Sequence, residues 1–214
     1  MRLDAGVSTS RNTSLNLGAR RPVPLVGFSP AWSALAGEIA ACTRCPLHRT
    51  RRHVVVYRGG PRPWALFVGE APGADEDLAG IPFVGRAGKR LDAAIGFLGL
   101  GPEAFGVLNV VKCRPPKNRF SPEAASACRP FLDRQLALLR PGVVVTLGAH
   151  ALAAFEPNVR RITEVAGIPR QWGATPLFPL LHPAAAMHAP KYRDRWDHDV
   201  RGLDRFLRSL PGRP

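Results

Sequence analysis

Short, continuous runs of apolar residues alternate along the chain with longer segments that have apolar residues at helical spacing. Four runs have the length of buried strands, and they span residues 65–68, 107–111, 143–147 and 176–181. Each run is followed by a helical pattern, and these patterns span residues 87–98, 122–139, 149–155 and 197–207. Strands that are apolar on both faces and alternate with helices are typical of a parallel sheet. The pattern therefore predicts an α/β fold in which helices cover both faces of a four-stranded parallel sheet.

The folded part of the chain is predicted to begin with a helix. Ser29 followed by Pro30 is a typical helix start, and apolar residues follow at helical spacing over 32–39. The preceding segment, residues 1–28, is basic and has little apolar periodicity, so we interpret it as a disordered tail. The remaining residues, 29–214, have the size of one ordinary domain.

Polar and glycine residues follow the predicted strands. They are Gly69 and Glu70 after the first strand, Asn109 near the end of the second, Gly148 after the third and His182 after the fourth. The carboxyl ends of parallel strands meet at one edge of a sheet, where α/β proteins bind their ligands. The sequence therefore predicts a ligand site at this edge.

The chain is strongly basic. It has 30 basic and 16 acidic residues, and its formal net charge is +14. Only four of the basic residues are lysines, and arginine suits bidentate contact with phosphate, although a GC-rich genome also enriches arginine. No apolar run approaches the roughly 18 residues that a membrane span needs. The charge favours a polyanionic partner, with nucleic acid first and an anionic membrane surface second.

Four cysteines form a pattern that suits a metal centre. Cys42 and Cys45 are a CxxC pair after the first predicted helix, whereas Cys113 and Cys128 follow the second predicted strand. Four thiolates can bind zinc or an iron–sulfur cluster, and this spacing alone does not discriminate between them. Disulfides are not expected without a signal peptide, and four unrelated buried thiols are the plain alternative.

The segment GEAPGADED, residues 69–77, places four carboxylates after the first predicted strand of an otherwise basic chain. Glu70 comes directly after the strand, where a carboxylate can position water or stabilise positive charge that develops on a sugar. Asp75 and Asp77 are equally well explained as solvated or helix-capping residues. Phe83 follows in a PFVG segment, where its ring can stack on a base or fill the core.

His182 opens the segment HPAAAMHAP after the fourth predicted strand. A lone histidine is more often structural, but at this edge it could donate a hydrogen bond to an oxyanion that forms on a leaving base. The small residues 184–186 and Met187 form a narrow loop tip of the kind that enters a minor groove and holds a flipped nucleotide out. A plain surface loop explains this segment equally well.

Several motifs occur in order between Cys42 and Met187. They are CxxCxL at 42–47, GEAPGxxED at 69–77, GxPFVGxAG at 80–88, NxxKCRPPxNR at 109–119, Cys128 and HPA at 182–184. In this the chain resembles the family 4 uracil-DNA glycosylases, the iron–sulfur type of bacteria and archaea. The resemblance implies a three-layer α/β/α sandwich and the removal of uracil from DNA. It also implies a 4Fe-4S cluster on Cys42, Cys45, Cys113 and Cys128.

The resemblance further implies a role for each candidate site residue. Glu70 matches the glutamate of the water-activating motif, Glu76 a second acidic position, and His182 the histidine that stabilises the departing uracil anion. Asn109 takes the position of the asparagine that hydrogen-bonds the uracil edge, and Phe83 that of the stacking aromatic. The residues expected to bind the substrate are Ala71, Phe83, Asn109 and Met187.

The same resemblance implies a monofunctional enzyme of base excision repair that acts on uracil in double- or single-stranded DNA. We expect a monomer without membrane association, in the bacterial or archaeal cytoplasm and associated with the nucleoid. Flipping a base costs least when it is mispaired, so uracil opposite guanine should be the easier substrate. Two alternatives stay open at this point: a related glycosylase for other deaminated bases, such as hypoxanthine or xanthine, and a noncatalytic iron–sulfur protein that binds uracil or DNA.

Overall fold

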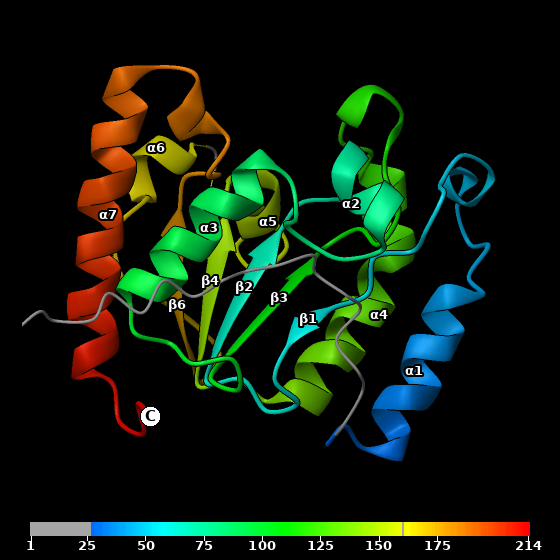
Figure 1. The fold of residues 1–214 in the computed structure, drawn as a ribbon, viewed down its shortest axis with the longest axis horizontal. Coiled ribbons are helices and arrows are strands. Elements are labelled where there is room, and N and C mark those ends of the chain that lie inside the picture. Colours follow the sequence, from blue (N-terminus) through cyan, green and yellow to red (C-terminus); the bar gives the residue numbers. More distant parts are fainter. Residues whose placement is uncertain (1–26, 160) are drawn as a thin grey trace, which may run out of the picture.

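The computed structural model describes residues 27–159 and 161–214. In these residues a six-stranded sheet, in the order β1-β3-β2-β4-β6-β5, lies between helices on its two faces (Figure 1). Except for Gly27 and Phe28, the tail predicted at 1–28 lies outside the described residues. The ring of Phe28 stacks on Trp32 with 5.1 Å between ring centroids, so the described fold begins just before the predicted first helix.

The four predicted strands form the centre of the sheet and are parallel to one another, as expected. They are β2 (Ala65–Gly69), β3 (Phe105–Asn109), β4 (Val143–Leu147) and β6 (Thr175–Leu180). β3 ends before the apolar run does. Val110 and Val111 leave the sheet register, and their N–H groups donate to the carbonyl groups of Gly69 and Glu70, each at 2.9 Å. This places Glu70 and Asn109 side by side at the carboxyl edge.

Two short antiparallel strands that the sequence analysis did not predict complete the edges of the sheet. β1 (Arg58–Gly59) pairs with β3, and β5 (Arg170–Trp172) pairs with β6. They are only two and three residues long. Segments this short have no apolar run or alternation that could reveal a strand.

The helices agree with the predicted segments, with additions and one early start. α7 begins at Pro190 rather than at 197. The sequence pattern missed this start because the first six residues of α7 are mostly polar. The helices are α1 (Pro30–Ala40), α2 (Ala74–Ala79), α3 (Arg86–Phe97), α4 (Pro122–Leu139), α5 (Ala149–Ala153), α6 (Ile162–Val165) and α7 (Pro190–Ser209). Short 3₁₀ turns are η1 (Pro46–Arg49), η2 (Pro116–Asn118) and η3 (Ala185–Met187).

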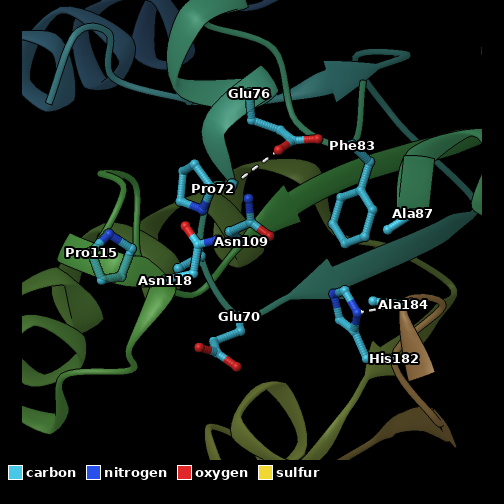
Figure 2. A pocket seen from close by; sticks show the side chains of 12 residues that line it. Glu70, Pro72, Glu76, Phe83, Ala87, Asn109, Pro115, Asn118, His182 and Ala184 are labelled. Atoms are coloured by element: carbon cyan, nitrogen blue, oxygen red, sulfur yellow. Dashed lines mark hydrogen bonds between the residues drawn. The ribbon is translucent and has the colours of Figure 1, made fainter. Parts of the chain in front are cut away.

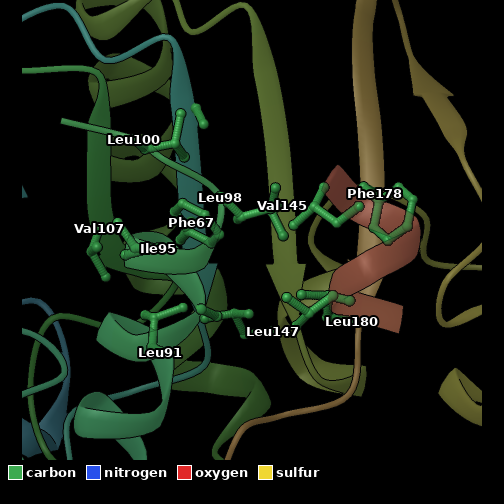
Figure 3. Packing of buried hydrophobic residues seen from close by; sticks show 14 of the residues in the cluster. Phe67, Leu91, Ile95, Leu98, Leu100, Val107, Val145, Leu147, Phe178 and Leu180 are labelled. Carbon is green, nitrogen blue, oxygen red and sulfur yellow. The ribbon is translucent and has the colours of Figure 1, made fainter. Parts of the chain in front are cut away.

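Alternate residues of the central strands point into two separate cores. On β2, Ala65 and Phe67 pack with α3 and α7 in one core, which Figure 3 shows from close by. Leu66 and Val68 pack with α4 and α5 in the other core. This two-sided burial gives the three-layer α/β/α sandwich and explains why the strands read as continuous apolar runs.

The first helix brings the CxxC pair to the second core layer. The Ser29 hydroxyl accepts a hydrogen bond from the Trp32 N–H at 3.2 Å, which caps α1 as predicted. Leu35 and Ile39 then pack on Phe131 of α4. Cys42 and Cys45 follow the helix directly and so lie near Cys128 of α4. Within the described part of the chain, no helix is long and apolar enough to cross a membrane.

Candidate active site

A pocket of about 320 Å³ opens at the carboxyl edge of the sheet, where the sequence predicts a ligand site. It lies where β2, β3 and β6 end and is closed by the loop that precedes α3 (Figure 2). The side chains around it come from five separate chain segments. They are Glu70, Ala71, Pro72, Gly73, Glu76, Phe83, Ala87, Asn109, Pro115, Asn118, His182 and Ala184.

Asn109 is the last residue of β3 and presents its amide to this pocket (Figure 2). The residue is 1% exposed, and among the described residues neither its amide nitrogen nor its amide oxygen has a hydrogen-bond partner. Gly69 of β2 lies opposite, and a Cβ atom there would stand 2.4 Å from the Asn109 Oδ1. A buried amide without partners is costly to a fold. The Asn109 amide therefore offers both a donor and an acceptor at the pocket wall.

Phe83 forms one wall of the pocket and has an unusual backbone. Its φ is +55°, in the left-handed region that residues other than glycine rarely adopt. A Cβ atom at Gly88 would lie 1.9 Å from the Phe83 carbonyl oxygen, so glycine is required there. The Phe83 ring lies against Gly69 and faces the His182 ring, with 5.8 Å between ring centroids. The turn thus presents a flat apolar surface beside Asn109.

Glu76 holds the loops that frame the pocket. One carboxylate oxygen accepts hydrogen bonds from the N–H groups of Val84 and Gly85, both at 2.9 Å, and the other accepts from Gly73 N–H at 3.0 Å. The carboxylate therefore ties the start of α2 to the turn that carries Phe83. Asp77 is also buried and accepts a hydrogen bond from the Arg52 N–H at 2.9 Å, so it belongs to the local framework.

Glu70 follows β2 and stands at the opposite side of the pocket from Glu76 (Figure 2). Its side chain is half-buried. Burial raises the pKa of the Glu70 carboxyl above its ordinary value, and the charge of His150 opposes this rise. The carboxylate is thus partly withdrawn from water and remains open to the pocket.

His182 is held as a neutral imidazole. Burial lowers its pKa to about 4, and its Nδ1 accepts a hydrogen bond from the Ala184 N–H at 3.2 Å (Figure 2). A neutral imidazole that accepts at one ring nitrogen carries its proton on the other. The Nε2–H group of His182 is therefore a donor on the pocket wall.

The pocket includes most, but not all, of the site residues expected from the sequence. Six expected residues line it together, whereas Met187 lies on η3 outside the lining. Pro115 and Asn118 line it although the sequence analysis gave them no role. Asn118 and its neighbour Lys117 both have a positive φ, and an asparagine shortly after two prolines is a signal for such a turn. The six expected residues are Glu70, Ala71, Glu76, Phe83, Asn109 and His182.

Comparison with known proteins identifies the family. A model of the uracil DNA glycosylase superfamily matches residues 56–201, which include the whole pocket. A type-4 uracil-DNA glycosylase of Archaeoglobus fulgidus is 39% identical over 78% of this chain and 88% of its own length. Another, of Thermotoga maritima, is 44% identical over 69% of this chain and 78% of its own length. The chain belongs to the type-4 uracil-DNA glycosylases.

A third type-4 uracil-DNA glycosylase, of Sulfurisphaera tokodaii, is 40% identical over 82% of this chain and 84% of its own length. The similarity to the type-5 uracil-DNA glycosylase of Thermus thermophilus is weaker, at 33% identity over 57% of this chain and 70% of that protein. The type-4 relatives named here come from archaea and a bacterium.

A second, much smaller cavity in this type-4 glycosylase is lined by all four cysteines. None of the four forms a disulfide. The Arg51 guanidinium donates to the Cys113 Sγ at 3.3 Å, and the Arg44 N–H donates to the Cys42 Sγ at 3.4 Å. Burial raises the pKa of the Cys113 thiol, and the bond from Arg51 opposes this rise. All four cysteines thus line one space, and the sulfurs of Cys42 and Cys113 each accept a hydrogen bond.

The four cysteines around this cavity are a donor set for a metal centre. Among the described residues, no three His, Cys, Asp or Glu side chains converge closely enough to hold a single metal ion. Around one zinc ion with bonds of about 2.3 Å, sulfurs would lie only about 3.8 Å apart. In an iron–sulfur cluster each cysteine binds its own iron, so the sulfurs stand around a larger centre. Four cysteines line one cavity, and four thiolates are the donor number that both kinds of centre use.

Proposed function

We propose that this glycosylase hydrolyses the N-glycosidic bond of deoxyuridine in DNA and leaves an abasic site, as the first step of base excision repair. A base inside a duplex cannot reach such a pocket, so the nucleotide is flipped out of the stack. The observation that carries the proposal is the buried amide of Asn109, without a partner among the described residues, in the same pocket as Phe83 and His182.

Asn109 and Phe83 are proposed to recognise the base. The amide nitrogen of Asn109 can donate to uracil O4 while its oxygen accepts from N3–H, and cytosine presents a donor in place of O4. The Phe83 ring offers a stacking surface beside this amide. Ala71 lies next to Glu70 in the pocket lining, and its small side chain leaves room for the flipped base.

His182 is proposed to stabilise the leaving group. As the bond from C1′ to uracil N1 breaks, its electron pair moves to the base, and negative charge develops on N1 and O2. A donor fixed in place before the reaction stabilises such charge without a cost of reorganisation. The Nε2–H of neutral His182 has this position, because Nδ1 is already occupied by the Ala184 N–H.

Glu70 is proposed to act on the sugar side of the broken bond. The deoxyribose becomes an oxocarbenium-like cation, which a nearby carboxylate stabilises. The same carboxylate can orient the water whose oxygen forms the new bond to C1′ and can accept the proton that this water releases. Support for this role comes from the position of Glu70 at the end of β2, half-buried on the pocket wall.

Glu76 is proposed to position the pocket loops, and Met187 is proposed to contact the DNA. The three N–H groups bound by the Glu76 carboxylate favour a positioning role, in which it holds the Phe83 turn against the pocket. Met187 lies on η3, three residues after the Ala184 that lines the pocket, where it can enter the gap left by a flipped nucleotide.

We further propose that the protein is a monomer and removes uracil from both double- and single-stranded DNA. Its net charge of +14 would hold it near the DNA of the nucleoid.

We also propose that Cys42, Cys45, Cys113 and Cys128 hold a 4Fe-4S cluster. When bound, such a cluster would supply a cross-link rather than electrons, because hydrolysis needs no redox step. The four cysteines come from the end of α1, the segment after β3 and the middle of α4. A bond at each of them would join the second core layer to the edge of the pocket.

Replacing Cys113 by serine should remove one iron ligand and expose the pocket edge to local unfolding. We expect the brown colour and most of the bound iron to be lost, together with much of the soluble yield. Iron content per chain and the visible absorption spectrum measure this. Ser209→Ala, at an exposed residue at the end of α7, is the surface control and should keep both. Full iron content in the Cys113→Ser protein would exclude Cys113 as a ligand.

Replacing Asn109 by leucine, which has a similar shape, tests the reading of the base. Without the paired hydrogen bonds, the single-turnover rate of uracil excision should fall about 10- to 100-fold, since such a pair contributes roughly 1–3 kcal/mol. The fold should become more stable, by about 1–2 kcal/mol, because a buried amide without a partner among the described residues is replaced by an apolar side chain. Rapid-quench assays and urea unfolding measure the two effects. An unchanged excision rate would show that another residue reads uracil.

A further inference from the structure

Lys112 lies buried between the uracil pocket and the cysteine cavity. Its residue is 1% exposed and is among the largest fully buried side chains of the described chain. It follows Asn109 by three residues, and its Nζ donates a hydrogen bond to the main-chain carbonyl of Asn109. The same residue lines the cavity of the four cysteines. One residue thus touches both centres.

A buried ammonium group needs a negative partner, because an isolated charge in an apolar interior is expensive. Lys112 lines the cysteine cavity together with Cys113, the next residue in the chain, and Cys128 of α4. The main-chain N–H of Lys112 also hydrogen-bonds the Cys128 sulfur. When these cysteines bind a metal as thiolates, their negative charge lies beside Lys112.

The main chain around Lys112 is fixed on both sides. Its carbonyl accepts a hydrogen bond from the Val55 N–H at 2.8 Å, and the preceding Val111 N–H donates to the Glu70 carbonyl at 2.9 Å. Asn109 has no side-chain bond within the described residues that could orient its amide. The direction of that amide depends on its main chain, and Lys112 holds the carbonyl of that main chain.

We infer that Lys112 is a positioning residue that couples the cysteine centre to the residue that reads uracil. Its ammonium group balances the thiolates on one side and fixes the Asn109 carbonyl on the other. The inference rests on the proposed function for its effect on excision, whereas its effect on the cysteine centre does not. Partners of this kind, which orient groups that bind metal or substrate, typically contribute about 10- to 100-fold to metal affinity or activity.

The test compares iron-loaded wild-type protein with Lys112→Met, which keeps the length of the side chain and removes its charge and donors. Arg205→Met is the matched control, because Arg205 is exposed on the half of α7 remote from the pocket and also loses one positive charge. Single-turnover uracil excision and the rate of iron loss to a chelator are measured on each protein. We expect Lys112→Met to excise about 10- to 100-fold more slowly and to lose iron faster, and Arg205→Met to match the wild type.

The same substitution in a protein that already carries Asn109→Leu distinguishes a positioning role from a general loss of structure. If Lys112 acts through Asn109, the substitution should cost no further excision rate in a protein that already carries Asn109→Leu, because contacting residues in one network are not additive. Iron loss should still be faster in that double variant.

If Lys112→Met yields no iron-loaded protein, Lys112→Gln replaces it. This variant keeps a donor for the Asn109 carbonyl but no charge, so it should lose iron faster with a smaller loss of rate.

Wild-type excision together with wild-type iron retention in Lys112→Met would overturn the inference. A change in only one of the two measurements, or a full additional rate loss on Asn109→Leu, would overturn the coupling between the two centres. Failure of the proposed function looks different, since wild-type protein would then release no uracil while the effect of Lys112 on iron retention stayed measurable.

Discussion

Replacing Glu70 by glutamine should lower the single-turnover rate of uracil excision about 10²- to 10⁴-fold, the range that a general acid or base typically contributes. Glutamine keeps the shape of the side chain but has neither the negative charge that favours an oxocarbenium-like sugar nor the basicity that water activation needs. Binding of uracil-containing DNA should change much less, because the charge matters most when the sugar becomes cationic. Rapid-quench kinetics and a fluorescence binding titration measure the two quantities.

The pH dependence gives this prediction a sharper form. Burial raises the pKa of Glu70 above its ordinary value of 4.5, so the carboxylate should gain its proton at a higher pH than a free glutamate does. The excision rate of the wild type should fall as the pH drops through this pKa, and Glu70→Gln should lose that acid limb. Glu164→Gln, an exposed control on α6, should keep both the wild-type excision rate and its fall at low pH. A Glu70→Gln protein with the wild-type rate would remove Glu70 from the chemistry.

Replacing His182 by alanine should lower the excision rate about 10²- to 10³-fold, which is the typical cost of removing one donor to a developing anion. The loss should appear in the chemical step, while substrate binding is largely kept. The rate should not follow the ordinary titration of a histidine near pH 6.5, because burial lowers the pKa of His182 to about 4 and the neutral donor form persists above that pH. His198→Gln, an exposed histidine on α7, serves as the control. An unchanged rate in His182→Ala would rule out this assignment.

The same pKa makes a prediction for stability. The unfolded chain binds a proton at His182 near pH 6.5, whereas the folded chain resists it until about pH 4, so stability falls as the pH drops between these values. The loss attributable to His182 between pH 7 and pH 5 is about 2 kcal/mol. His182→Gln should therefore lose less stability than the wild type over this range in urea unfolding. Equal losses would show that the imidazole is not held neutral.

The central sheet could be predicted from sequence because its strands are buried on both faces. Each of the four strands is a continuous apolar run between helical segments, and this pattern also brought Glu70, Asn109 and His182 to one edge. The short edge strands could not be predicted, because β1 and β5 have too few residues to show a pattern.

The roles of single side chains were harder to predict where they depend on contacts between distant segments. Glu76 stands in a carboxylate-rich motif, but only the folded loops bring the N–H groups of Gly73, Val84 and Gly85 to its carboxylate. Lys112 reads as a surface lysine, since lysines are almost never fully buried. Its burial follows from the meeting of β3, α4 and the cysteine segments in space.

The most direct test of the account is single-turnover release of uracil by iron-loaded protein. Labelled oligonucleotides would carry uracil opposite guanine, opposite adenine or in a single strand, with hypoxanthine and xanthine for comparison, and abasic sites would be scored after alkaline cleavage. We predict uracil release, fastest opposite guanine among the duplexes, and its near-complete loss in Glu70→Gln and His182→Ala. No release of uracil from any of these substrates, or release that both substitutions leave unchanged, would contradict the account.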